Sequence, residues 1–178
     1  MNTAPMIDLT EYVRPVPDFP KPGILFRDIT PLLASPEAFA AAVKAMAEAW
    51  EGKIDAVAAL DARGFVFGSA LALSLGLPLI LVRKKGKLPG KTERLSYGLE
   101  YGTDTLEIAV ETLPKVSAAL VVDDLLATGG TAKAACELLE KAGVGVAGCA
   151  FAIELTGLPG RKALSGRAVR SILSYSNE

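Results

Sequence analysis

Short apolar runs alternate along this chain with segments whose apolar residues repeat at helical spacing. The apolar runs predict strands buried on both faces, at 54–60, 78–82, 119–122 and 144–153. The helical spacing predicts helices at 36–51, 65–75 and 131–142. Because strands and helices alternate, we expect an α/β fold with a mainly parallel central sheet and helices on both faces.

Two segments do not follow this alternation. Residues 1–34 carry five prolines before Gly23 and predict an extended N-terminal arm that leads into a small hood. Residues 84–102 are rich in glycine and charge, which predicts a long irregular loop of the kind that often acts as a lid. Residues 105–111 alternate like a strand, with a partner expected at 97–101, and 169–173 predicts a last short strand.

The composition limits the classes of function. A chain of 178 residues, 51% apolar, predicts one domain over 1–178 with a substantial core. A net charge of −1 gives no electrostatic attraction for nucleic acid or an anionic membrane, so neither is expected as a partner. Because the chain has no histidine, acid–base chemistry must use a carboxylate, a lysine or a tyrosine.

Cysteine usage and the absence of a visible targeting segment predict a cytoplasmic location. Cys136 and Cys149 lie in apolar surroundings without metal-ligand spacing, as expected of core thiols in a reducing compartment. Residues 64–82 carry no charge, but Gly76 and Pro78 divide them into a buried helix and a buried strand rather than a membrane span.

Two nucleotide-binding patterns occur in the wrong context. Residues 143–148 match G-x-G-x-x-G, but they follow a predicted helix and open a strand, so we interpret Gly143 as a helix C-cap. Residues 86–92 resemble a Walker A loop with one residue too few between the glycines, and no amphipathic helix follows.

The most informative pattern follows the buried run at 119–122. Asp123 and Asp124 come at the end of this strand, and a loop containing Thr128, Gly129 and Gly130 leads to a helix that begins at Thr131. Backbone N–H groups of such a loop converge on a phosphate at the helix N-terminus, while the carboxylates accept hydrogen bonds from sugar hydroxyls or hold Mg²⁺ through water. The pattern predicts a site for a phosphorylated sugar; the alternative is an ordinary strand, turn and capped helix.

Other charged residues lie beyond predicted strand ends. Arg63, beside Gly64 and the start of a helix, is suited to bind pyrophosphate, although an ordinary surface arginine is the alternative. For Arg83 and Lys84 the alternative is stronger than for Arg63, because a solvated charge run after a strand is common, and Glu100 alone is an exposed carboxylate. The loops at 61–64, 83 onward and 123–131 should meet at the carboxyl ends of the parallel strands, where ligands bind in such sheets.

The segment 119–131 resembles the phosphoribosyl-pyrophosphate (PRPP) motif of the type I phosphoribosyltransferases. Beyond this motif, nearly the whole chain resembles the adenine phosphoribosyltransferase family. The matching blocks are PDFPKPG (17–23), FRDITPL (26–32), LDARGF (60–65), RKKGKLPG (83–90), SYGLEYG (96–102) and ELT (154–156). Ala62 departs from the serine of some family members, which should matter little if that loop acts through its backbone.

The resemblance implies the reaction of adenine with PRPP to give AMP and pyrophosphate, with Mg²⁺ bound indirectly through PRPP and water near Asp123 and Asp124. It also implies a homodimer, in which Arg83 reaches a neighbouring subunit. The implied roles are as follows: the 5′-phosphate is bound by Ala127, Thr128, Gly129, Gly130 and Thr131; the ribose by Asp123 and Asp124; pyrophosphate by Asp61, Ala62, Arg63, Arg83 and Lys84; adenine by Leu25, Phe26, Arg27 and Leu155; catalysis uses Glu100 and Arg63, with Tyr101 in the lid.

Two alternative functions follow from the same pattern. A 6-oxopurine phosphoribosyltransferase would use hypoxanthine, guanine or xanthine, but such a site generally needs a donor side chain toward the exocyclic oxygen, and 24–27 is mostly apolar. A non-catalytic regulator that senses PRPP or purines would keep the fold without the chemistry. The near-zero charge and the lack of a spare DNA-binding segment disfavour the regulator.

Overall fold

The structure is a computed structural model that describes residues 7–99 and 102–176. Its elements in chain order are the 3₁₀ helix η1 (Leu9–Tyr12), β1 (Arg14–Val16), β2 (Phe26–Asp28), α1 (Thr30–Ala34), α2 (Pro36–Glu48), β3 (Ala56–Leu60), α3 (Gly64–Leu75), β4 (Leu79–Lys84), β5 (Thr92–Leu99), β6 (Gly102–Ala109), β7 (Ala119–Leu126), α4 (Gly130–Lys141), β8 (Val146–Leu155), α5 (Gly160–Ala163) and β9 (Val169–Tyr175). No helix in this described part is long and apolar enough to cross a membrane.

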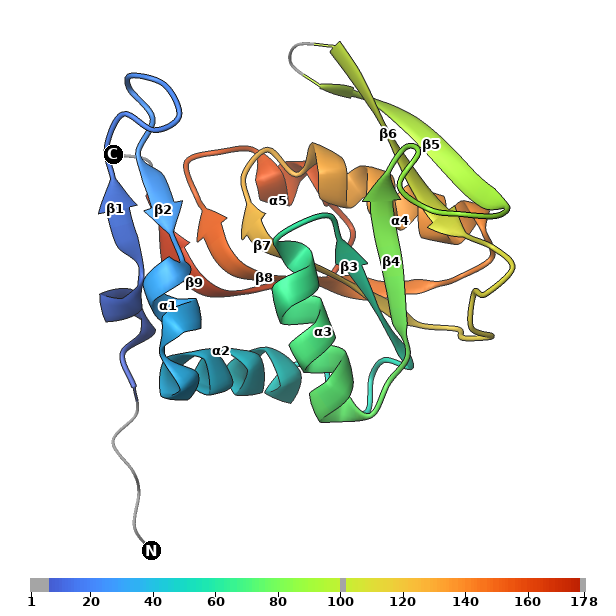
Figure 1. The fold of residues 1–178 in the computed structure, drawn as a ribbon, viewed down its shortest axis with the longest axis horizontal. Coiled ribbons are helices and arrows are strands. Elements are labelled where there is room, and N and C mark those ends of the chain that lie inside the picture. The colour runs from blue at the N-terminus through green and yellow to red at the C-terminus, as the bar shows by residue number, and fades with distance from the viewer. Residues whose placement is uncertain (1–6, 100–101, 177–178) are drawn as a thin grey trace, which may run out of the picture.

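A seven-stranded sheet forms the centre of the molecule, in the order β5-β6-β4-β3-β7-β8-β9. Five neighbouring strands of this sheet pair in parallel, in the order β4-β3-β7-β8-β9. Strand β6 pairs antiparallel with both β4 and β5. Figure 1 shows the β5–β6 hairpin at one end of the molecule and the small antiparallel β1–β2 pair beside β9 at the other. The carboxyl ends of the parallel strands lie between these two ends, at a single edge of the sheet.

Helices cover both faces of the sheet, as the alternation predicts. On one face α4 packs with its buried Leu138 and Leu139 against inward side chains such as Leu60 and Phe151. On the other face α2 and α3 pack with Met46 and Phe67 against residues that include Val57, Leu120 and Val122. All five residues of β3 are buried, which explains its continuous apolar run. The predicted α/β class is therefore confirmed.

Two predicted boundaries are wrong, and one short helix was not predicted. The expected hairpin is present, but its first strand, predicted at 97–101, is β5 over residues 92–99; residues 92–96 therefore form a regular strand paired with β6 rather than an irregular loop. Strand β7 continues beyond Val122 to Leu126, because it pairs with β8 as far as Glu154 and this pairing carries Asp123 and Asp124 inside the sheet. Residues 30–34 add α1, a short helix that begins at Thr30-Pro31 and has no clear apolar period.

The G-x-G-x-x-G pattern at 143–148 has a structural explanation. Gly143, two residues after α4, has φ +86°, which favours glycine and fits the predicted helix end. A Cβ on Gly145 would lie 2.2 Å from the Ser117 carbonyl oxygen, and one on Gly148 would lie 2.2 Å from the Trp50 ring. These glycines therefore permit close packing at the start of β8.

Candidate active site

A cavity of about 430 Å³ opens at the carboxyl ends of β3, β4 and β7. Its lining combines the ends of these strands with α4 and the hairpin, and consists of Asp61, Ala62, Arg63, Lys84, Tyr97, Asp104, Leu106, Asp123, Asp124 and Thr131. This is the edge at which ligands bind in parallel α/β sheets. Seven of these ten residues belong to the site that the sequence predicts.

Close backbone packing brings the Asp61–Gly64 loop to the end of β7. A Cβ on Gly64 would lie 2.8 Å from both the Val122 carbonyl oxygen and Asp123 Oδ1, so only glycine fits here without a shift. Gly64 also begins α3, whose first turn presents backbone N–H groups at this edge. Arg63, directly before it, is thereby held beside the carboxylates of β7.

The loop from Ala127 to Thr131 joins β7 to α4 and packs against α5. Gly129 has φ +80°, and a Cβ there would lie 2.7 Å from the Gly160 carbonyl oxygen. A Cβ on Gly160 would in turn lie 2.5 Å from the Ala127 carbonyl oxygen. The two glycines therefore let α5 support the loop, which leads into the N-terminus of a twelve-residue helix suited to bind phosphate.

Each of three basic side chains at the cavity is paired with an aspartate. Arg63 Nε lies 2.9 Å from Asp124 Oδ2, and Lys84 Nζ lies 3.0 Å from Asp104 Oδ2. Arg83 Nε lies 3.1 Å from Asp61 Oδ2, beside the cavity lining. The site thus holds cations for a phosphorylated ligand and carboxylates for hydroxyls or a metal.

Burial and neighbouring charge shift the titration of these groups. Burial raises the pKa of Asp123 well above its ordinary value, and the adjacent Asp124 raises it further. The hydrogen bond from Lys84 lowers the pKa of Asp104, and the same contact raises the pKa of Lys84. Burial raises the pKa of Tyr97, whose hydroxyl lies 3.2 Å from Thr131 Oγ1.

A second cavity, of about 410 Å³, lies between residues 23–27, in the segment for which the sequence predicts a hood (called the hood below), and the ends of β8 and β9. It is lined by Gly23, Ile24, Leu25, Arg27, Leu155, Leu158 and Ser176. The guanidinium of Arg27 stacks over the Tyr175 ring at 4.2 Å, which joins the hood to β9. The Arg63 guanidinium lies 5.3 Å from the centre of the Phe26 ring, so Phe26 connects this region with the first cavity.

The structure distributes the predicted site residues over three places. Asp61, Ala62, Arg63, Lys84, Asp123, Asp124 and Thr131 line the first cavity, and Leu25, Arg27 and Leu155 line the second. Ala127, Thr128 and Gly129 form the loop before α4, with Thr128 exposed, and Gly130 is the first residue of that helix. Arg83 contacts Asp61 and donates to the Lys87 carbonyl of its own chain, so its reach to a neighbouring subunit stays a prediction. Glu100 and Tyr101 lie outside the described residues.

Sequence reasoning missed three residues of the first cavity, Tyr97, Asp104 and Leu106. All three lie on the hairpin, where Tyr97 is directly opposite Asp104. Period-two alternation could have indicated Asp104, because it shares one side of β6 with the buried Leu106 and Ile108. An acid in line with two buried apolar residues points toward the interior.

Among the described residues, no group of three or more histidine, cysteine, aspartate or glutamate side chains is arranged to hold a metal ion. Asp123 and Asp124 are adjacent oxygen donors at the cavity. This donor set fits Mg²⁺, which commonly keeps several waters and binds through one or two carboxylates together with substrate phosphates.

Comparison with known proteins agrees with this geometry. The family model described as phosphoribosyl transferase domain matches residues 28–170. The adenine phosphoribosyltransferase of Rhodopirellula baltica is 50% identical over 97% of this chain and 84% of its own length, and that of Methylococcus capsulatus is 50% identical over 96% and 100%.

Solved structures give the same result. The adenine phosphoribosyltransferase of Thermoanaerobacter pseudethanolicus superposes with a TM-score of 0.89 at 47% identity, covering 94% of this chain and 98% of that one. The APRTase of Giardia lamblia, complexed with 9-deazaadenine, superposes with a TM-score of 0.87 at 33% identity, covering 97% and 99%.

Proposed function

The chain belongs to the adenine phosphoribosyltransferase family, and from this premise we propose how its residues carry out the reaction. The enzyme transfers a phosphoribosyl group from PRPP to adenine, and the products are AMP and pyrophosphate. One observation carries the assignment of roles: a single cavity combines the end of the Asp123-Asp124 strand, the start of the helix after the phosphate loop, Arg63 from the 61–64 loop and Lys84 from the end of β4.

We assign the 5′-phosphate of PRPP to residues 127–131 and the ribose hydroxyls to Asp123 and Asp124. Backbone N–H groups at the start of α4 and the Thr131 hydroxyl are the donors for the phosphate. Asp124 forms an ion pair with Arg63, so a ribose that takes this carboxylate frees the Arg63 guanidinium for pyrophosphate. Binding at one part of the cavity thereby prepares the other.

Catalysis depends mainly on alignment and on neutralising the leaving group. Holding adenine against the anomeric carbon can contribute about 7–11 kcal/mol. Arg63, Lys84 and the amides of the 61–64 loop stabilise the charge that grows on the departing pyrophosphate. Glu100 is proposed, from the family resemblance, to handle the proton of the purine imidazole, a role worth about 10²–10⁴-fold. Bound Mg²⁺, near Asp123 and Asp124, would neutralise further negative charge on the diphosphate.

We place adenine between the hood and the end of β8. Leu25 and Arg27 line one side of the second cavity and Leu155 lines the other, while the adjacent Phe26 ring is available for stacking. This surface is mostly apolar, and backbone groups would read the edge of the base. Such a pocket suits adenine better than a base with an exocyclic oxygen.

We also propose a homodimer and a cytoplasmic location. Leu73 and Val66 of α3 and Leu81 of β4 are exposed apolar side chains, which a second subunit would cover. Leu81 and Arg83 project from the same side of β4, so a partner on this surface would lie within reach of Arg83. The free thiols of Cys136 and Cys149, with Sγ atoms 3.6 Å apart, suit a reducing compartment.

A base-specificity assay tests the proposed function. Adenine, hypoxanthine, guanine and xanthine are each incubated with PRPP and Mg²⁺, and AMP formation from adenine alone is expected. Removal of Mg²⁺ with a chelator should lower turnover at least tenfold.

Lys84→Ala should raise the KM for PRPP about tenfold, because Lys84 lines the cavity. Lys85 is an exposed neighbour outside the cavity, so Lys85→Ala should change the KM for PRPP less than twofold. A nucleotide product from a 6-oxopurine, or no product at all, would contradict the proposal.

A further inference from the structure

Asp104 is an acid of the PRPP cavity that the proposed reaction does not use. Asp124 and Asp61, the partners of Arg63 and Arg83, already have proposed substrate roles. Asp104 has none, yet it lines the cavity and contacts Lys84, the proposed pyrophosphate ligand. An anionic side chain beside the binding position of a highly charged anion needs an explanation, because it weakens binding of that anion.

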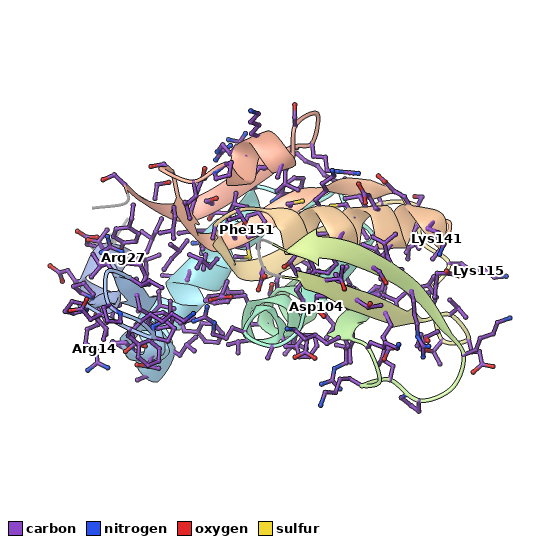
Figure 2. The ribbon with its side chains drawn as sticks, turned by 90° about the horizontal axis from the view of Figure 1, so that it is seen from above. Arg14, Arg27, Asp104, Lys115, Lys141 and Phe151 are labelled. Carbon is purple, nitrogen blue, oxygen red and sulfur yellow. The ribbon has the colours of Figure 1, made fainter. Side chains whose placement is uncertain are left out.

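The hairpin that carries Asp104 contacts both parts of the PRPP cavity. Across from Asp104 on β5, the Tyr97 hydroxyl lies 3.2 Å from Thr131 Oγ1 in the proposed phosphate loop. Asp104 itself reaches Lys84 at the end of β4. In the view of Figure 2, from above, Asp104 lies near the middle, whereas Lys141 lies at the far end of α4.

Within this pair the carboxylate is fixed and the lysine is free to move. Asp104 Oδ1 also accepts a hydrogen bond of 2.8 Å from the Thr105 backbone N–H, and its side chain is 22% exposed. The Lys84 side chain is 60% exposed and has several rotatable bonds. An arriving pyrophosphate group can therefore draw Lys84 away from Asp104 without moving the strand.

We propose that Asp104 is a positioning residue that holds Lys84 in the empty site and competes with pyrophosphate for it. Once Lys84 has moved to the ligand, the Asp104 carboxylate is left without that cation and repels the ligand. When pyrophosphate leaves, Lys84 returns to Asp104, so the ion pair favours the release of this product. The inference rests on the proposed function, in which Lys84 binds pyrophosphate.

Calorimetric titration with inorganic pyrophosphate at a fixed Mg²⁺ concentration tests this inference. Asp104→Asn removes the charge and keeps the shape, so pyrophosphate should bind about two- to fivefold more tightly, as expected for an ion pair this exposed. Asp104→Thr should also strengthen pyrophosphate binding, and threonine is a residue that is favoured in strands. Glu93→Gln is the matched control. Glu93 lies on the same hairpin but outside the cavity, and its carboxylate pairs at 2.6 Å with Lys141 of α4. Removing this charge should leave the affinity for pyrophosphate unchanged.

A double-mutant cycle separates this inference from the proposed function. In a Lys84→Ala background, Asp104→Asn should have less than half of its effect in the wild-type protein, because the competition for Lys84 is gone and only the repulsion remains. If Lys84→Ala alone does not weaken pyrophosphate binding, the assignment of Lys84 fails, and the inference fails with it. If Lys84→Ala weakens pyrophosphate binding but Asp104→Asn does not strengthen it, only the inference about Asp104 is overturned. Weaker pyrophosphate binding by Asp104→Asn would mark Asp104 as a ligand of Mg²⁺ or of the substrate.

Discussion

Glu154 is a buried carboxylate at the point where β8 reaches the proposed adenine cavity. Its two oxygens accept hydrogen bonds from Arg161 Nε at 2.6 Å and Nη2 at 2.7 Å, and Ser171 donates a third at 2.9 Å. The hydrogen bonds from Arg161 are the main cause that lowers the pKa of Glu154, so this group is ionised at neutral pH. The cluster joins β8 to α5 and β9 and fixes the strand end that carries Leu155.

Glu154→Gln should lower the free energy of unfolding at pH 7 by about 1–2 kcal/mol, less than for a fully buried pair because Arg161 is mostly exposed. Since the pKa is lowered on folding, this stabilisation is present above the ordinary pKa of 4.5 and is lost as the pH falls through the folded value. Urea unfolding at pH 7 and pH 3 checks both statements: the difference from wild type should shrink at pH 3. Glu48→Gln, in an exposed pair with Lys44, should change little at either pH. An undiminished difference at pH 3 would show that charge is not the cause.

Individual contacts of this kind could not be predicted from the sequence. The sequence places Arg63, Asp123 and Asp124 at one edge of the sheet, because strand ends meet there. It does not show that Arg63 pairs with Asp124, 61 positions away, since that contact depends on how closely Gly64 approaches β7. Residue types and loop positions were therefore predictable, whereas the pairing of charges was not.

At the scale of elements, prediction succeeded where an element's own side chains determine its structure. Strand β3 and the first half of β7 are continuous apolar runs because both of their faces are covered. Strand β5 was predicted only near its end, at 97–101, because its first half contains Glu93 and Arg94 and its structure depends on pairing with β6. A strand that is specified mainly by its neighbour leaves only a weak pattern in its own sequence.

Helix α5 is another element that the sequence did not reveal, and Gly160 at its start packs on the proposed phosphate loop. Gly160→Ala places a methyl group about 2.5 Å from the Ala127 carbonyl oxygen, so the loop or α5 must shift. We expect the KM for PRPP to rise about tenfold, because a small displacement of a binding loop is costly. Steady-state kinetics with PRPP and adenine varied separately measures this, and the KM for adenine should change less.

Gly148→Ala is the matched control for Gly160→Ala. Its new methyl group would meet the Trp50 ring at 2.2 Å, in a closely packed part of β8 outside both cavities. Both variants should lower the melting temperature, but only Gly160→Ala should raise the KM for PRPP. Equal kinetic effects in the two variants would mean that α5 contributes general stability rather than support of the loop.

At the scale of the whole molecule, the two cavities lie between parts that are far apart in sequence. The hood contributes Leu25 and Arg27 from the start of the chain, β8 contributes Leu155 from near its end, and the hairpin covers the other side. The order of strands and helices predicts the edge of the sheet at which ligands bind. It does not predict the position of the hood, because that position depends on tertiary contacts such as the stacking of Arg27 on Tyr175.

The outer surface of α3 provides the last test. This helix is apolar on all sides, which is typical of a buried helix, yet Leu73 is 84% exposed in the single chain. Beside it, an apolar groove of about 680 Å³ between α2 and α3 extends the same surface. An exposed apolar surface of this extent is typical of a protein–protein interface.

We therefore expect the wild-type protein to sediment as a dimer and Leu73→Glu to sediment as a monomer, because the interface would have to bury an unpaired charge. Phe19→Glu introduces the same charge at an exposed apolar position of the hood and should leave the dimer intact. Analytical ultracentrifugation over a range of concentrations distinguishes the two states. If Arg83 reaches the neighbouring site, the Leu73→Glu monomer should also lose affinity for PRPP. A wild-type monomer, or a Leu73→Glu dimer, would exclude α3 as the interface and leave Arg83 with the contacts to Asp61 and the Lys87 carbonyl that it makes within its own chain.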